Sequence, residues 1–193
     1  MRLVSIAAVL LFLHAASASA KCVPHQLLKI VTTESTDKDA ARITLYRLGE
    51  KYARLQIGSE LIVVSEPDIW MAELPTMTGK HTVDGGEPVF HAVIFGEIDS
   101  KLWSQLEFGC EVAFMKAVKA ATEPRDGGGT RYTHASDGVR VTLDVDAKEI
   151  PKSIAIAGSK RDLTLTYVEY GPSDAKPEEL FAKPQGVRFG DPE

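Results

Sequence analysis

Cys22 and Cys110 are the two side chains of this sequence that could form a covalent bond with each other. In an oxidising compartment an even number of cysteines favours a disulfide, and two cysteines allow one intramolecular pairing. The chain-entropy model gives such a bridge about 4–5 kcal/mol of stability. The alternative is that Cys110 is a small buried apolar residue and Cys22 lies in a frayed terminus. A catalytic thiol is not expected, because oxidising surroundings consume free thiols.

The histidines and the glycine-rich stretch of the chain show no arrangement that holds a metal or a phosphate. Outside the first 20 residues the histidines are far apart in the sequence, at His25, His81, His91 and His134, which is not the usual spacing of metal ligands. The run Gly127–Thr130 lacks the lysine and the preceding strand of a phosphate-binding loop. The sequence therefore predicts no metal and no cofactor.

Two pairs of carboxylates could exchange protons or bind Ca²⁺. Asp144 and Asp146 lie at the end of an expected strand, a position that is typical of a solvated turn. Glu107 and Glu111 lie four residues apart on an expected helix and are expected to face water. With no Ser–His–Asp arrangement in view, the sequence predicts no catalytic residue and no enzyme.

The first 20 residues have the pattern of a secretory signal peptide. A basic start at Arg2 precedes the apolar run 3–13, and Ala18-Ser19-Ala20 is a small-residue cleavage site. We therefore expect a signal peptide over residues 1–20 and a single domain over residues 21–193, located in the periplasm or, alternatively, secreted. No later run approaches the roughly 20 apolar residues of a transmembrane helix. The formal net charge is −5 with no basic stripe, which argues against nucleic acid as a partner.

Alternating apolar residues predict an antiparallel sheet that positions the rest of the chain. Five short strands are expected between residues 42 and 83, and three more over residues 139–145, 153–157 and 163–168. Apolar spacings of three and four predict a helix from about residue 100 to residue 118, with Gly109 as a weak point that could split it. A short helix is also expected near residues 26–31. The expected fold class is α+β, with about eight antiparallel strands in one curved sheet covered by one or two helices.

The run "ITLYRLGEKYARLQIGSELIVVSEPDIWMAELPTMTGKHTV" and the closing "LFAKPQGV" resemble LolA-like periplasmic proteins. The resemblance covers about residues 43–83 and 139–187. It implies an incomplete antiparallel β-barrel that is closed by a helical lid and whose cavity receives acyl chains. It also implies an arginine on an early strand that holds the lid, for which Arg47 and Arg54 are candidates.

The resemblance and the apolar residues together predict a non-catalytic binding or carrier protein for a lipid or acyl chain, with an acylated protein as a further partner. The alternative is an envelope interaction or stress-sensing module with a solid core, because the same residues would pack any core at native density. The expected ligand-binding residues are Leu55, Ile57, Ile62, Val64, Trp70, Phe90, Phe95, Trp103 and Phe114.

Overall fold

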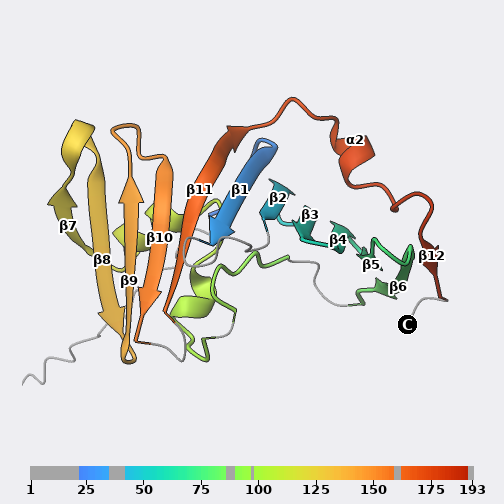
Figure 1. Ribbon diagram of the computed structural model, residues 1–193, viewed down its shortest axis with the longest axis horizontal. Coiled ribbons are helices and arrows are strands. Elements are labelled where there is room, and N and C mark those ends of the chain that lie inside the picture. The colour runs from blue at the N-terminus through green and yellow to red at the C-terminus, as the bar shows by residue number, and fades with distance from the viewer. Residues whose placement is uncertain (1–21, 35–41, 86–89, 97, 159–161, 191–193) are drawn as a thin grey trace, which may run out of the picture.

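The computed structural model describes residues 22–34, 42–85, 90–96, 98–158 and 162–190. The expected signal peptide lies outside these residues. Twelve strands form one curved sheet in the order β12-β6-β5-β4-β3-β2-β1-β11-β10-β9-β8-β7 (Figure 1). The strands are β1 (Leu28–Glu34), β2 (Ile43–Leu48), β3 (Tyr52–Ile57), β4 (Glu60–Ser65), β5 (Asp68–Glu73), β6 (Thr78–Val83), β7 (Ala121–Pro124), β8 (Thr130–Ser136), β9 (Val139–Val145), β10 (Pro151–Ala157), β11 (Leu163–Pro172) and β12 (Arg188–Phe189).

The sheet consists of two antiparallel meanders that meet in the middle. Strands β2 to β6 pair in sequence order, which confirms the predicted five-stranded meander. Strands β7 to β11 form the second meander. β1 joins the two halves, because it pairs with β2 on one side and with β11 on the other. The chain therefore brings its early and late thirds together at the centre of the sheet.

The predicted α+β fold, with an incomplete antiparallel barrel of about eight strands under a helical lid, is wrong. The sheet is open and has twelve strands, and β12 runs parallel to β6, so the sheet is mixed. Glycine at position 79 allows this last pairing, because a Cβ atom there would lie only 2.7 Å from Cε1 of Phe189. The residues themselves predict one curved antiparallel sheet, and the barrel came from the resemblance alone.

The helix expected near residues 26–31 is also wrong, since residues 28–31 belong to β1. The β-branched residues Ile30, Val31 and Thr32 are all buried in this central strand. Such residues favour strands, but a strand with both faces covered has no alternation to reveal it. β7, β8 and β12 were missed for a different reason: each is short or mostly polar, so the pattern of apolar residues is weak.

One long helix over residues 100–118 does not form. The stretch holds a 3₁₀ turn, η1 (Trp103–Gln105), and one short helix, α1 (Glu111–Ala117). Gly109 between them has a φ of 89°, a conformation that favours glycine. The split at Gly109 was therefore anticipated correctly, but most of the covering segment, defined here as residues 90–96 and 98–118, is irregular. The remaining short elements are η2 (Asp126–Gly128) and α2 (Pro177–Leu180).

Two apolar clusters lie on opposite faces of the sheet. The larger one, the main core, packs the covering segment against the sheet and includes Trp103, Leu106 and Met115, which are fully buried. The smaller one packs the C-terminal strap, residues 173–190, against the other face of β4 and β5. Alternate residues of β4 enter each cluster: Val63 lies in the smaller and Val64 in the main core. This explains why β4 has a continuous apolar run.

Candidate functional site

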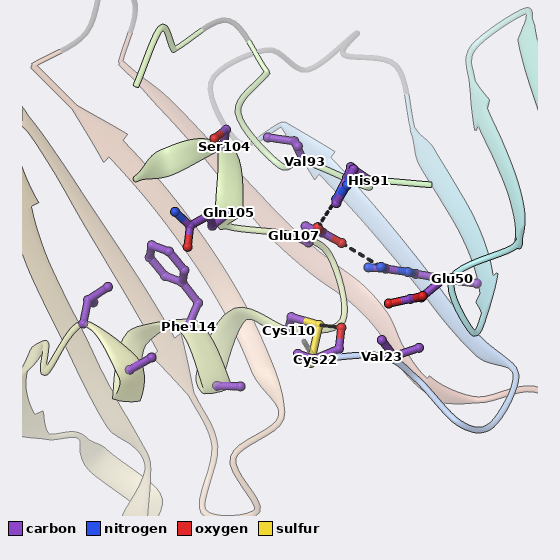
Figure 2. A pocket seen from close by; sticks show the side chains of 14 residues that line it. Cys22, Val23, Glu50, His91, Val93, Ser104, Gln105, Glu107, Cys110 and Phe114 are labelled. Carbon is purple, nitrogen blue, oxygen red and sulfur yellow. Dashed lines mark hydrogen bonds and ion pairs between the residues drawn. A yellow bond between two sulfur atoms is a disulfide. The ribbon is translucent and has the colours of Figure 1, made fainter. Parts of the chain in front are cut away.

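An open pocket of about 990 Å³ lies between the covering segment, the end of β2 and the first described residues of the chain (Figure 2). Its size falls within the roughly 300–1,000 Å³ that is typical of small-molecule sites. It is lined by Cys22, Val23, Arg47, Glu50, His91, Val93, Ser104, Gln105, Glu107, Cys110, Ala113, Phe114, Ala117 and Val118. The walls are apolar on the α1 side, and the charged residues gather at the opposite end.

Small side chains on α1 leave room for the pocket. Ala113 and Ala117 lie one turn apart on the helix and are both exposed. The next residues along α1, Phe114 and Met115, are buried against the sheet. The helix therefore presents Met115 to the main core, its alanines to the pocket, and Phe114 to both.

A disulfide joins Cys22 to Cys110, which confirms the predicted pairing. It forms part of the pocket wall and links the first described residue, Cys22, to the residue just before α1 (Figure 2). A hydrogen bond also holds this stretch to the turn after β2: the backbone N–H of Gly49 donates to the carbonyl of Pro24 at 2.9 Å. The wall formed by Cys22 and Val23 thus depends on a covalent link to the covering segment.

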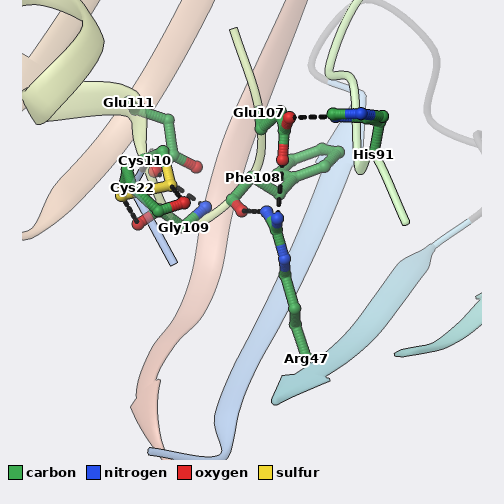
Figure 3. Close-up of polar contacts among 8 residues, drawn as sticks. All are labelled: Cys22, Arg47, His91, Glu107, Phe108, Gly109, Cys110 and Glu111. Atoms are coloured by element: carbon green, nitrogen blue, oxygen red, sulfur yellow. Dashed lines mark hydrogen bonds and ion pairs between the residues drawn. A yellow bond between two sulfur atoms is a disulfide. The ribbon is translucent and has the colours of Figure 1, made fainter. Parts of the chain in front are cut away.

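A buried ionic network forms the polar end of the pocket (Figure 3). Arg47, on β2, lies 2.7 Å from Oε2 of Glu107 and donates to the carbonyl of Phe108 at 3.0 Å. The other carboxylate oxygen of Glu107 lies 2.6 Å from Nδ1 of His91. The side chains of Arg47 and Glu107 are only 3% and 13% exposed. Arg47 therefore holds the covering segment to the sheet through two bonds to adjacent residues.

Of the two arginines proposed from the resemblance, Arg47 is the one that contacts the covering segment. Arg54, on β3, lies on the other face of the sheet and donates to the carbonyl of Leu180 at 3.2 Å. That contact holds the C-terminal strap instead. The sequence alone could not separate them, because both are strand arginines and the register of each strand decides the face.

Glu107 and Glu111 do not face water as predicted. Glu111 is fully buried at the start of α1, where its carboxylate accepts bonds from the backbone N–H of Gly109 at 3.0 Å and from the hydroxyls of Tyr167 and Tyr170 at 2.9 and 3.2 Å. Burial raises the pKa of Glu111, and these hydrogen bonds only partly oppose the rise. Burial and the nearby carboxylate also raise the pKa of both tyrosines. The burial of the two glutamates was missed because the predicted helix placed both of them on its outer face.

Replacing Glu111 with glutamine is expected to change how stability depends on pH. A carboxyl group whose pKa is raised on folding stabilises the fold below its unfolded value of about 4.5, and that contribution is lost as the pH rises through the folded value. The free energy of unfolding of the wild type should therefore fall, relative to Glu111→Gln, as the pH increases above about 4.5. Urea denaturation of both proteins across this range measures the difference. A difference that does not vary with pH would contradict the raised pKa.

The nine predicted ligand-binding residues are divided among different places. Phe114 lines the pocket. Trp70 lies in the smaller cluster on the opposite face of the sheet, and Ile57 is exposed. Three residues are buried in the main core, namely Val64, Phe95 and Trp103, and three are half-buried against it, namely Leu55, Ile62 and Phe90. The predicted residues therefore lie mostly in or against the main core. The pocket lies elsewhere, between the covering segment, the end of β2 and the first described residues.

The remaining polar candidates are explained by local bonds. Arg131 donates two hydrogen bonds of 2.7 Å to the carboxylate of Asp144 and lowers the pKa of that carboxyl. Asp146 accepts from the backbone of the turn that follows, at Lys148 and Ile150. His81 bonds to Asp68 and stacks on Trp70, and His134 lies edge-on to Trp103. Within the described part of the chain, no three histidine, cysteine or acidic residues are placed to hold a metal ion.

Comparison with known proteins adds a similar fold but no activity. No family model matches the sequence, and no curated protein is similar to it. Among solved structures, an uncharacterised conserved protein from Thermus thermophilus is similar, with a TM-score of 0.51 and 13% identity over 88% of this chain and 91% of that one. A likeness at this identity concerns the fold alone. The resemblance to LolA-like proteins therefore stays a prediction.

In the described residues, no helix is both long and apolar enough to cross a bilayer.

Proposed function

We propose that the protein is an exported, LolA-like binding or carrier protein that takes up an apolar ligand, a lipid or acyl chain, in the pocket beside α1. The observation that carries this proposal is the pocket itself, because it combines apolar walls with one charged end. Ligand sites are mostly apolar with a few polar groups that orient the ligand. The affinity would come from burying the chain, at about 25 cal/mol per Å² of apolar surface.

The hold of Arg47 on the covering segment supports this proposal. The resemblance implies an early-strand arginine that holds a lid, and Arg47 binds both the side chain of Glu107 and the carbonyl of Phe108. The disulfide supports the expected oxidising compartment. The lid would differ from the expected one, since it is the irregular covering segment with one short helix.

Filling the pocket is expected to abolish ligand uptake. In the variant Ala113→Leu/Ala117→Leu, two larger side chains would occupy the space that the alanines leave open, and both sites are exposed, so little stability should be lost. We expect the affinity for a fluorescent apolar probe such as N-phenyl-1-naphthylamine to fall by at least about tenfold, which corresponds to about 1.4 kcal/mol. Fluorescence titration of the oxidised protein provides the measurement.

The matched control is Lys116→Leu, which adds a leucine to the same helix but outside the pocket wall. Lys116 forms an exposed ion pair with Glu149, and such pairs contribute little to stability. The control should bind the probe as the wild type does. Equal binding by the pocket-filled variant would show that the probe binds elsewhere. Native mass spectrometry of protein purified from its own host would then identify any lipid that copurifies.

A second candidate is an interaction or stress-sensing module without a ligand. The observation that favours it is the solid main core, in which Trp103, Leu106 and Met115 leave no exposed surface. This candidate predicts no probe binding in the wild type and no copurifying lipid. The titration described above therefore separates the two functions.

A further inference from the structure

The reachable side chain of the ionic network at the polar end is His91. Arg47 and Glu107 are nearly buried and are bonded to each other. The side chain of His91 is 57% exposed and lines the pocket. A ligand in the pocket therefore meets the imidazole of His91 before the other two groups.

The partner of His91 determines which hydrogen bond the imidazole offers. An ionised carboxylate can only accept, so in a neutral imidazole the proton lies on Nδ1, 2.6 Å from Oε1 of Glu107. The other ring nitrogen, Nε2, then carries a lone pair and accepts a hydrogen bond. This nitrogen thus presents an acceptor to a ligand in the pocket.

We propose that the pocket takes a single-chain amphiphile whose head group donates a hydrogen bond, as a hydroxyl does, to Nε2 of His91. The inference rests on the proposed function, since the chain would lie along Val23, Ala113 and Ala117. A carboxylate head cannot donate a hydrogen bond to this nitrogen. His91 is therefore a residue that determines specificity, and the preferred ligands are long-chain alcohols or monoacylglycerols over fatty acids.

Competition between two ligands of equal chain length tests this inference. In this experiment decanol and decanoate compete with N-phenyl-1-naphthylamine for the oxidised full chain at about pH 8. The informative quantity is the ratio of their affinities, compared between the wild type and His91→Phe. Loss of one hydrogen bond should lower the preference for decanol by about tenfold in the variant. The control His25→Phe changes an exposed histidine that does not line the pocket and should leave the ratio unchanged.

A second variant, Glu107→Gln, should move the ratio in the direction of decanoate. Arg47 needs an acceptor, so the amide oxygen would face Arg47 and the amide nitrogen would donate to Nδ1 of His91. The imidazole proton would then move to Nε2, which becomes a donor. Folding of this variant is checked by urea denaturation, and the His91→Phe result does not depend on it.

The outcomes separate the two proposals. A lower decanol preference in His91→Phe, with the control unchanged, supports the inference. An unchanged ratio in a variant that still binds both ligands overturns the role of His91 and leaves the pocket function in place. A wild type that binds neither the probe nor the two ligands overturns the proposed function and this inference together.

Discussion

Replacing Arg47 with methionine is expected to lower the free energy of unfolding by about 3 kcal/mol, the lower end of the range for breaking a buried ion pair. The substitution keeps most of the side-chain volume but leaves the carboxylate of Glu107, 13% exposed, without its cationic partner. It also removes the donor to the carbonyl of Phe108. The retained contact of Glu107 with His91 keeps the loss near the lower end. The midpoint of urea denaturation measures the change.

Two further variants show whether the unpaired charge causes the loss. The double variant Arg47→Met/Glu107→Gln removes both charges, so it should be more stable than Arg47→Met alone, and the two substitutions should not be additive. Arg54→Met is the matched control, because Arg54 bonds to one carbonyl with a single hydrogen bond. Its loss should be about 1 kcal/mol. Additive effects, or equal losses for the two arginines, would contradict the proposed role of Arg47.

Removing the disulfide is expected to have the largest effect on stability. Cys22 and Cys110 are 88 residues apart, and the chain-entropy model then gives about 4–5 kcal/mol for the bridge. The variant Cys22→Ser/Cys110→Ser should therefore lose that amount, seen as a fall in Tm of about 10–15 °C. Calorimetry of the variant and of the oxidised wild type measures the loss.

A local measurement distinguishes the effect on the pocket wall from the global loss. Without the bridge, the stretch around Cys22 loses its covalent link to the covering segment, so limited proteolysis under native conditions should cut this stretch faster. The wild type treated with a reductant should behave as the variant does. A stability loss below about 1 kcal/mol, with no faster cutting around Cys22, would show that packing alone fixes this wall.

Local patterns in the sequence were sufficient for the elements with a clear period. The alternation in β3 and β9 predicted both strands with the observed bounds, because one face of each strand is covered more than the other. The two cysteines predicted the bridge, because the expected signal peptide indicates an oxidising compartment. The break at Gly109 was visible too, since glycine is a poor helix former.

Only the tertiary structure decided the site. Whether Arg47 or Arg54 holds the covering segment depends on strand register, since neighbouring strands can present their arginines to opposite faces. Burial of Glu111 depends on Tyr167 and Tyr170, more than 50 residues away in the chain. The pocket depends on Cys22, His91 and Ala113, which are far apart in the sequence but line the same pocket. The sequence by itself therefore determined most strands, the expected compartment and the disulfide, because these follow from local pattern and composition. The open twelve-stranded sheet and the position of the pocket follow from long-range pairing, which no local pattern encodes.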